Sequence, residues 1–255
     1  MRKIEPLSLF VSTLLFILAA VSSYADETRK ELNGSDLQEF LDKAELSVEY
    51  FEANGADLLG DREKAKTHRE KIISYYGRIL DDPRSTYNQR LEAVREMGSL
   101  SIQCGNYDEA VALYKNALAE FPDNRAVSNE LAEALYAQAM GYAVSGQADK
   151  AVANCLFILD MDDIHPNWQP FIKHYLGNIY LAEGRYEDAL SWYEEIASEH
   201  QDLKNWPACA YYSIAELYII RGEYTKAKEY LQTILNQYPL SSWSRLAQDK
   251  IKEMS

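Results

Sequence analysis

Four short segments share one pattern, in which a glycine is followed five residues later by an alanine: GNYDEA at 105–110, GQADKA at 146–151, GRYEDA at 184–189 and GEYTKA at 222–227. The steps from one alanine to the next are 41, 38 and 38 residues. A tyrosine upstream of the last three segments recurs with the same 38-residue step, at Tyr142, Tyr180 and Tyr218. Two columns with one period predict a chain built from repeated units.

Each unit is predicted to be a helical hairpin. The glycine lets the first helix end in a left-handed residue, and the small alanine lets the second helix approach the first closely. Prolines that stop a helix follow three of the expected second helices, at Pro122, Pro166 and Pro239. Pro170 and Pro207 fall in the first turns of the next helices, where proline is tolerated. The pattern therefore predicts antiparallel helix pairs.

These units resemble the tetratricopeptide repeat family, whose pattern runs small residue, Tyr, Gly, Tyr, Ala, aromatic, Ala and Pro along two antiparallel helices. The unit near residue 91 matches with Gly98, Gly105, Tyr107, Ala110, Tyr114, Ala117 and Pro122. The unit near residue 170 matches with Leu176, Gly177, Tyr180, Gly184, Tyr186, Ala189 and Tyr193. The unit near residue 208 matches with Ala215, Tyr218, Gly222, Tyr224, Ala227 and Pro239, and the weaker one near 132 with Ala139, Tyr142, Gly146 and Ala151.

The resemblance implies an all-α fold, a right-handed superhelical solenoid of antiparallel helix pairs with four to five repeats and a C-terminal capping helix. The observed step exceeds the usual period of about 34 residues, which indicates longer helices or connections. The ending QYPLSSW at 237–243, followed by an amphipathic helix, is similar to exported bacterial repeat proteins of cell-envelope assembly and division.

The chain divides into four predicted segments: a signal peptide at 1–25, an N-terminal helical pair at 26–86, four repeats at 87–240 and a capping helix at 241–255. In the N-terminal pair, a second helix is expected over 61–80. Gly60 and Ala65 reproduce the five-residue step there, so this pair is a candidate for a degenerate fifth repeat. The capping helix carries one apolar stripe, formed by Trp243, Leu246, Ala247, Ile251 and Met254.

The N-terminus has the layout of a secretory signal peptide. Arg2 and Lys3 precede an apolar run of 13 residues at 9–21, and small residues stand at Ser23 and Ala25. A helix needs about 20 apolar residues to span a bilayer, so cleavage after Ala25 is favoured over an uncleaved anchor, which would give a weak membrane association. The mature protein is therefore expected to be exported, to a periplasm or the cell exterior.

The composition is acidic, with 26 Lys and Arg against 40 Asp and Glu and a formal net charge of −14. Such a surface disfavours nucleic acid and anionic lipid, and it suits basic partners or simply solubility. Cys104, Cys155 and Cys209 are odd in number and lie in segments with helical periodicity. They are interpreted as buried free thiols, in preference to a functional pair.

The sequence carries no motif for catalysis, and neither a cofactor, a metal nor a small-molecule substrate is predicted. Its histidines are scattered, and none forms a cluster with metal-ligand spacing. The acidic run at 160–163 invites a calcium interpretation. A calcium loop, however, needs glycine and an acid where this chain has His165 and Phe171, so a polar connection is favoured.

The resemblance places a partner-binding groove on the first helices of the repeats. Carried over by position, its middle is formed by Arg95, Ser99, Tyr136, Met140, His174, Asn178, Tyr212 and Glu216. A clamp for a C-terminal carboxylate would need lysines where Phe171, His174, Cys209 and Tyr212 stand, so that ligand is disfavoured. We expect a protein or peptide segment in the groove, with Tyr136, His174 and Tyr212 as anchors. The alternative is that these three side chains only pack against neighbouring repeats.

Three classes of function compete. An exported adaptor in envelope biogenesis or secretion is favoured, because a solenoid presents a surface without chemistry. The second is a self-assembling structural protein, a homo-oligomer in which one copy's groove takes the terminal helix of the next. The third, an enzyme, is disfavoured because the repeats leave only residues 26–86 for an unrecognised site.

Overall fold

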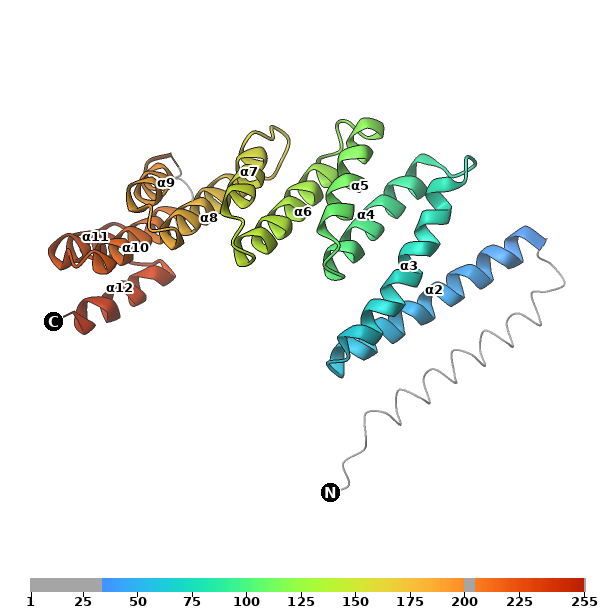
Figure 1. Cartoon of the computed structure of the whole chain (residues 1–255), viewed down its shortest axis with the longest axis horizontal. Coiled ribbons are helices and arrows are strands. Elements are labelled where there is room, and N and C mark those ends of the chain that lie inside the picture. The colour runs from blue at the N-terminus through green and yellow to red at the C-terminus, as the bar shows by residue number, and fades with distance from the viewer. Residues whose placement is uncertain (1–33, 200–204, 255) are drawn as a thin grey trace, which may run out of the picture. The chain divides into compact units, whose positions relative to one another are not determined.

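The computed structural model describes residues 34–199 and 205–254, and every regular element in these ranges is an α-helix (Figure 1). The predicted signal peptide lies outside the described residues. The helices are α2 (Gly34–Leu58), α3 (Arg62–Asp81), α4 (Tyr87–Gln103), α5 (Tyr107–Glu120), α6 (Arg125–Val144), α7 (Ala148–Leu159), α8 (Trp168–Ala182), α9 (Tyr186–Glu199), α10 (Asn205–Ile220), α11 (Tyr224–Gln237) and α12 (Ser242–Glu253). None of them combines the length and the apolar character needed to cross a membrane.

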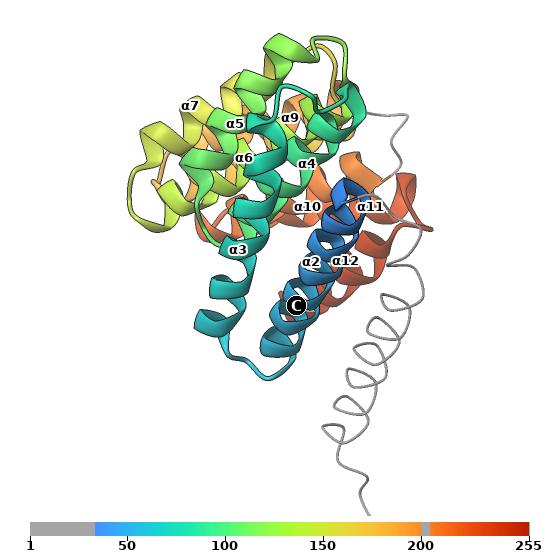
Figure 2. The same ribbon diagram turned by 90° about the vertical axis from the view of Figure 1, so that its right-hand side faces the viewer.

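The chain forms two compact units, which divide between Ala93 and Val94. This division falls inside α4, whereas the sequence suggested a boundary after residue 86. In the first unit, α2 and α3 pack side by side as a hairpin (Figure 2). Asp61 caps α3 by accepting a hydrogen bond from the backbone N–H of Lys64. Ala65 and Ile72 are fully buried between the two helices.

The second unit is a stack of antiparallel helix pairs that runs from the C-terminal half of α4 to α12 (Figure 1). From α5 onward each helix packs on the next, and α12 packs on both α10 and α11. This is the all-α arrangement of helix pairs that the tetratricopeptide resemblance implied.

Five helix-to-helix turns share one geometry. The glycines at their centres have φ between 72° and 79°, which L-residues with a side chain rarely adopt: Gly60, Gly105, Gly146, Gly184 and Gly222. At the first repeat, the Asn106 N–H donates to the Ser101 carbonyl (2.8 Å) and the Gly105 N–H donates to the Ile102 carbonyl (3.0 Å). The other four turns repeat this Schellman pattern, so the turn of the N-terminal pair has the same form as the repeat turns.

The alanine five residues after each of these glycines is fully buried, which explains why the residue is small at this position: Ala65, Ala110, Ala151, Ala189 and Ala227. A tyrosine precedes three of them at the start of the second helix. These tyrosines do not all lie between helices, because Tyr224 is 56% exposed.

A second contact between paired helices comes in two forms. In the first and third repeats, a ring on the second helix lies against a glycine of the first. A Cβ added to Gly98 would lie 2.1 Å from Tyr114, and one added to Gly177 would lie 2.3 Å from Tyr193. At the same positions the second repeat has Ala139 with Cys155, and the fourth has Ala215 with Leu231. All eight residues are buried.

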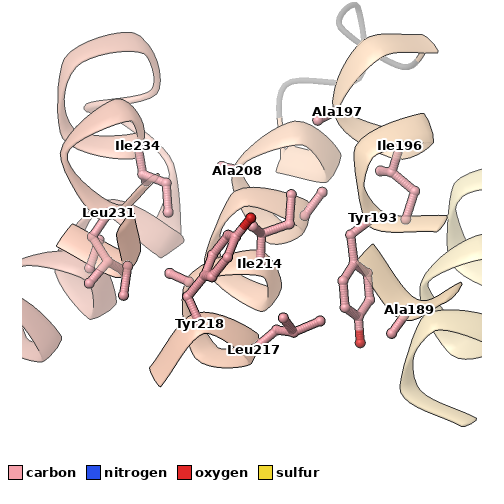
Figure 3. Packing of buried hydrophobic residues seen from close by; sticks show 14 residues of the cluster. Ala189, Tyr193, Ile196, Ala197, Ala208, Ile214, Leu217, Tyr218, Leu231 and Ile234 are labelled. Carbon is pink, nitrogen blue, oxygen red and sulfur yellow. The ribbon is translucent and has the colours of Figure 1, made fainter. Parts of the chain in front are cut away.

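The core of the last two repeats is continuous from α9 through α10 to α11 (Figure 3). It is closed by α12, whose Ala247 is fully buried and whose Trp243, Ile251 and Met254 pack against it. The predicted apolar stripe of the capping helix is wrong at Leu246, which is 42% exposed.

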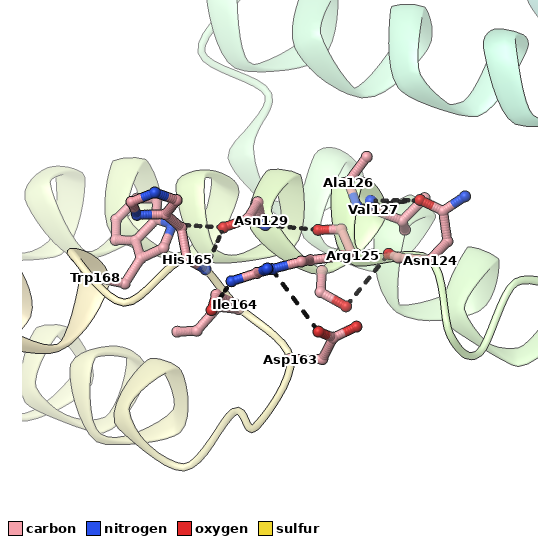
Figure 4. Close-up of polar contacts among 10 residues, drawn as sticks. Asn124, Arg125, Ala126, Val127, Asn129, Asp163, Ile164, His165 and Trp168 are labelled. Atoms are coloured by element: carbon pink, nitrogen blue, oxygen red, sulfur yellow. Dashed lines mark hydrogen bonds and ion pairs between the residues drawn. The ribbon is translucent and has the colours of Figure 1, made fainter.

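The connection between α7 and α8, residues 160–167, is held by the N-terminal turns of α6 (Figure 4). Arg125 donates to the Ile164 carbonyl (3.1 Å). The Asn129 side-chain oxygen accepts from the backbone N–H of His165 (2.8 Å) and from the Trp168 indole (3.1 Å). The acidic run in this connection is thus a polar link, with Asp163 3.9 Å from Arg125.

Candidate protein-binding surface

The eight residues predicted for the groove form two columns on the first helices of the second unit. Arg95, Tyr136, His174 and Tyr212, one from each of α4, α6, α8 and α10, are called the inner column. Four residues later in the same helices stand Ser99, Met140, Asn178 and Glu216, called the outer column. Residues four apart lie on one side of a helix, so the two columns share a face, called here the first-helix face.

Each of the first three members of the inner column contacts the following repeat, and Tyr212 contacts the capping helix α12. The Arg95 Nε lies 2.7 Å from the Glu130 Oε1. The next three members pack on tryptophans, with ring centroids 6.3 Å apart for Tyr136 and Trp168, 6.3 Å for His174 and Trp206, and 5.3 Å for Tyr212 and Trp243. The three predicted anchors thus pack against neighbouring helices and remain half-buried, and their role in partner binding stays a prediction.

The ring of Tyr136 is part of an edge-to-face cluster at the junction of α6 and α8. Its centroid lies 4.9 Å from that of Phe171 and 5.0 Å from that of Tyr175. Trp168 is fixed in this cluster by its indole hydrogen bond to Asn129. Such pairs each stabilise a fold by about 0.5–1.5 kcal/mol beyond burial, so this part of the face is rigid.

A hydrogen-bond chain fixes His174. The Tyr193 hydroxyl donates to the Asn178 side-chain oxygen (2.7 Å), which leaves the Asn178 amide nitrogen to donate to the His174 Nδ1 (3.4 Å). His174 then carries its proton on Nε2, 2.9 Å from the Ser213 oxygen. Burial lowers the pKa of His174, which favours this neutral form.

Ser213 and His174 have the spacing of a nucleophile and its base, but the surroundings do not suit acyl transfer. Ser213 lies in the middle of α10. The backbone N–H groups around it are used by the helix, so they cannot form an oxyanion hole. The pair is better explained as a contact that joins the third and fourth repeats.

The outer column is exposed, as is Arg95 at one end of the inner column. Ser99, Asn178 and Glu216 are exposed, and Met140 is 39% exposed. Glu216 lies 3.7 Å from the Lys250 ammonium of α12. A partner that approached this face would meet the outer column first and the edges of the inner rings second.

The end of the face nearest α4 is acidic. Glu96, Glu130 and Glu133, called the acidic patch, lie close enough to one another that Glu133 and Glu96 raise the pKa of Glu130. Burial is the larger cause of that rise, and the hydrogen bond from Arg95 opposes it. Within the described residues, Arg95 binds one Glu130 oxygen while the other, Oε2, is buried without a hydrogen-bond partner.

The described residues contain no group of three or more His, Cys, Asp or Glu side chains that could hold a metal ion. Cys155 and Cys209 are buried free thiols, as predicted, and Cys104 is half-buried. Burial raises the pKa of both buried thiols to about 12, so neither is reactive near neutral pH.

One feature that sequence reasoning missed lies in the first unit. An open hollow of about 800 Å³ is bounded by α2, α3 and the start of α4. Its wall includes Lys43, Tyr75, Arg78, Asp82 and Arg84. The ion pairs Lys43–Glu39 and Arg84–Asp82 lie in its wall. No repeat column predicts it, because residues of three different helices form it.

Comparison with known proteins supports the repeat assignment. Residues 170–239 and 102–140 match models of the tetratricopeptide repeat family. A stretch of 98 residues is 33% identical to the TPR repeat-containing thioredoxin TTL4 of Arabidopsis thaliana, and it covers 38% of this chain and 13% of that protein. The matched segments contain α8 to α11, α5 and most of α6.

A solved structure with a TM-score above 0.5 has the same fold. BtubC (BKLC) from P. vanneervenii is similar with a TM-score of 0.51 and 16% identity, over 87% of this chain and 91% of that one. A putative kinesin light chain with TPR-like repeats from Podosopora anserina has a TM-score of 0.47 and 21% identity, over 81% and 96%. A MamA protein has a TM-score of 0.43 and 16% identity, over 75% and 91%.

Proposed function

We propose that this protein is an exported, non-catalytic scaffold that holds a segment of another protein along its first-helix face, in cell-envelope biogenesis or secretion. The observation that carries the proposal is that the two columns differ in packing and in exposure. The three rings of the inner column pack on the next helix pair or, at Tyr212, on the capping helix, whereas every member of the outer column beside them is exposed. A surface that is rigid before a partner arrives loses little entropy on binding.

A photo-crosslinking amino acid tests which face is used. Placed at Met140, it lies on the first-helix face. Placed at Ala153, which is exposed on α7, it lies on a second helix and serves as the control. We expect a discrete crosslinked partner from position 140 in native cells and none from position 153. Equal crosslinking from both positions would contradict the proposal.

Export has its own test. The motif at 1–25 supports cleavage after Ala25. N-terminal sequencing of the protein recovered from its cells should then begin at Asp26. A chain that retains residues 1–25 would replace export by anchoring, without affecting the binding proposal.

Self-assembly is the second candidate, because Leu240 and Leu246 are exposed near α12. A contact through these two side chains leaves α12 packed in its own chain, where Ala247 is buried against the core. Light scattering on Leu246→Glu separates the two functions, since this change leaves the packed side of α12 intact. A dimer or polymer that the substitution dissociates would favour self-assembly, and an unchanged monomer would favour the scaffold.

A further inference from the structure

We infer that the segment held on the first-helix face is proline-rich and uncharged, and that it lies across successive first helices in the polyproline II conformation. This inference rests on the proposed function and adds the chemistry of the partner. It is carried by three tryptophans, each of which packs on a ring of the inner column. They are called here the tryptophan row: Trp168, Trp206 and Trp243.

The rings on this face form a continuous aromatic array across α6, α8 and α10. Phe171 links two members of the tryptophan row, because its ring centroid lies 5.7 Å from that of Trp168 and 6.3 Å from that of Trp206. The Trp206 ring in turn packs on His174 of the inner column. All four side chains are half-buried, so each ring keeps an accessible part. Grooves lined with aromatic rings are the surfaces on which proline-rich segments dock.

Two indole N–H groups of the tryptophan row are open to a partner. Trp168 donates its indole hydrogen to Asn129 (3.1 Å). In the part of the chain that the structure describes, the indoles of Trp206 and Trp243 donate to no acceptor, and neither nitrogen is buried. An indole N–H can only donate, so it pairs with an oxygen such as a backbone carbonyl. Proline offers this oxygen and has no N–H that would be left unpaired against the rings.

The charges of the two columns favour a neutral segment. Their charged members stand on the first and last of the four helices, and each has an opposite charge beside it. Arg95 lies 2.7 Å from Glu130, and Glu216 lies 3.7 Å from Lys250. Between them, burial alone lowers the pKa of His174, so no charged side chain of the described residues acts on this part of the face. A charged group placed here would lose hydration without gaining a counter-ion.

The spacing of the helices favours polyproline II over a β-strand conformation of the segment. Packed helices lie about 8–10 Å apart, and α8 packs on α10 with a hydrogen bond between His174 and Ser213 (2.9 Å). A polyproline II helix has three residues per turn and a rise of about 3.1 Å, so it presents one side about every 9 Å. A strand does so about every 7 Å. A proline at every third position can therefore contact successive first helices.

The first experiment measures the binding of fluorescein-labelled peptides of equal length to the purified protein by fluorescence anisotropy. One peptide repeats Pro-Pro-Ser, and its mirror image made of D-residues has the same composition and apolar character but the opposite helical hand. Three others repeat Ala-Ala-Ser, Pro-Pro-Lys and Pro-Pro-Glu. At about 0.3 M salt, which screens the general acidity of the chain, we expect Pro-Pro-Ser to bind about tenfold or more tightly than each of the others.

Two results would overturn the inference. Equal affinity for Pro-Pro-Ser and its mirror image, or binding of neither, would show that the face does not select polyproline II. A charged peptide that binds as tightly as Pro-Pro-Ser would show that the face does not select a neutral segment.

Trp206→Phe tests the donor, because it keeps a ring in the array and removes the indole N–H. It should weaken Pro-Pro-Ser binding about three- to tenfold, and Trp243→Phe should act in the same way. Trp192→Phe, an equal change at a half-buried tryptophan of α9, is the control and should change the affinity less than about twofold. Urea titration verifies that the variants remain folded. Equal losses from all three would overturn the placement on the tryptophan row.

A crosslink from position 140 separates failure of this inference from failure of the proposed function. Mass spectrometry of the crosslinked product identifies the segment of the partner that lies on the face. A proline-rich segment supports both proposals. A segment without prolines leaves the scaffold in place and overturns this inference. If position 140 captures no partner and none of the peptides binds, both proposals fail.

Discussion

The two helices of the first and third repeats contact each other through a glycine and a tyrosine. At the same positions the second and fourth repeats have an alanine with a cysteine or a leucine. In the third repeat the Tyr193 ring occupies the space left by Gly177, whereas in the fourth Leu231 stands opposite Ala215. The summed volume of the pair is similar in the third and fourth repeats while its distribution changes, whereas the Ala139 and Cys155 pair of the second repeat is smaller. A tyrosine on the second helix requires the absence of a side chain on the first.

The tyrosine of this pair also contacts residues of the first-helix face. The Tyr114 hydroxyl donates to the Arg95 carbonyl (3.2 Å), and the Tyr193 hydroxyl donates to Asn178 (2.7 Å). Cys155 and Leu231 carry no hydroxyl and cannot make this contact. Repeats with the glycine and tyrosine pair therefore connect their cores to the inner and outer columns through a polar bond.

The largest expected effect on stability comes from removing the Tyr193 ring. Tyr193→Ala should lower the free energy of unfolding by about 3–5 kcal/mol, because the ring is fully buried and its hydroxyl is bonded. Tyr224→Ala, at the 56% exposed tyrosine of the next repeat, should change it by less than about 0.5 kcal/mol. Urea titration followed by circular dichroism measures both, and similar losses would contradict the packing described.

A smaller effect comes from adding one methyl group. Gly177→Ala should destabilise the protein by about 1–3 kcal/mol, although alanine is the better helix former, because its Cβ would lie 2.3 Å from the Tyr193 ring. The double variant Gly177→Ala with Tyr193→Leu recreates the pair of the fourth repeat. It should be more stable than the sum of the single changes predicts, and additive losses would break the comparison.

The reverse change in the fourth repeat should cost less. Ala215→Gly meets no clash and leaves only a small void beside Leu231, so the expected loss is about 1 kcal/mol from helix propensity. The midpoint of thermal unfolding should fall accordingly. A loss larger than that of Gly177→Ala would reverse the order expected from the two kinds of pair.

The smallest effect is a dependence on pH through the polar chain of the third repeat. Burial lowers the pKa of His174 in the folded state, so below the ordinary value of about 6.5 the unfolded chain binds the proton more readily. Stability should therefore be complete above about pH 6.5 and fall as the pH is lowered through the folded pKa. Titrations in urea between about pH 7.5 and 5.5 should show a steeper fall for the wild type than for His174→Gln.

The repeat columns predicted the helix pairs because the determinants are local. A glycine with positive φ and a buried alanine five residues later act within one turn, and both were readable in the sequence. Gly98 and Tyr114 both matched the family pattern in the sequence. Only the structure showed that the Tyr114 ring lies so close to the Gly98 backbone that no side chain fits there.

The contacts made by the predicted groove residues could not be read from the sequence, because they join residues far apart in the chain. Tyr136 meets Trp168, which lies 32 positions later, and His174 meets Ser213, 39 positions later. Position in the repeat alone cannot show whether a side chain on the first helix contacts a neighbouring repeat. The outer column could be placed by position, but only the structure showed that all of it is exposed.

The hydrogen bonds that hold the connection at 160–167 also bear on its resistance to proteolysis. Proteases cut exposed loop tips that can unfold into an extended strand. Here Arg125 and Asn129 hold the backbone at Ile164 and His165, so a protease must first pull the connection away from α6. The longest described link in the stack is thereby the one fastened to its neighbour.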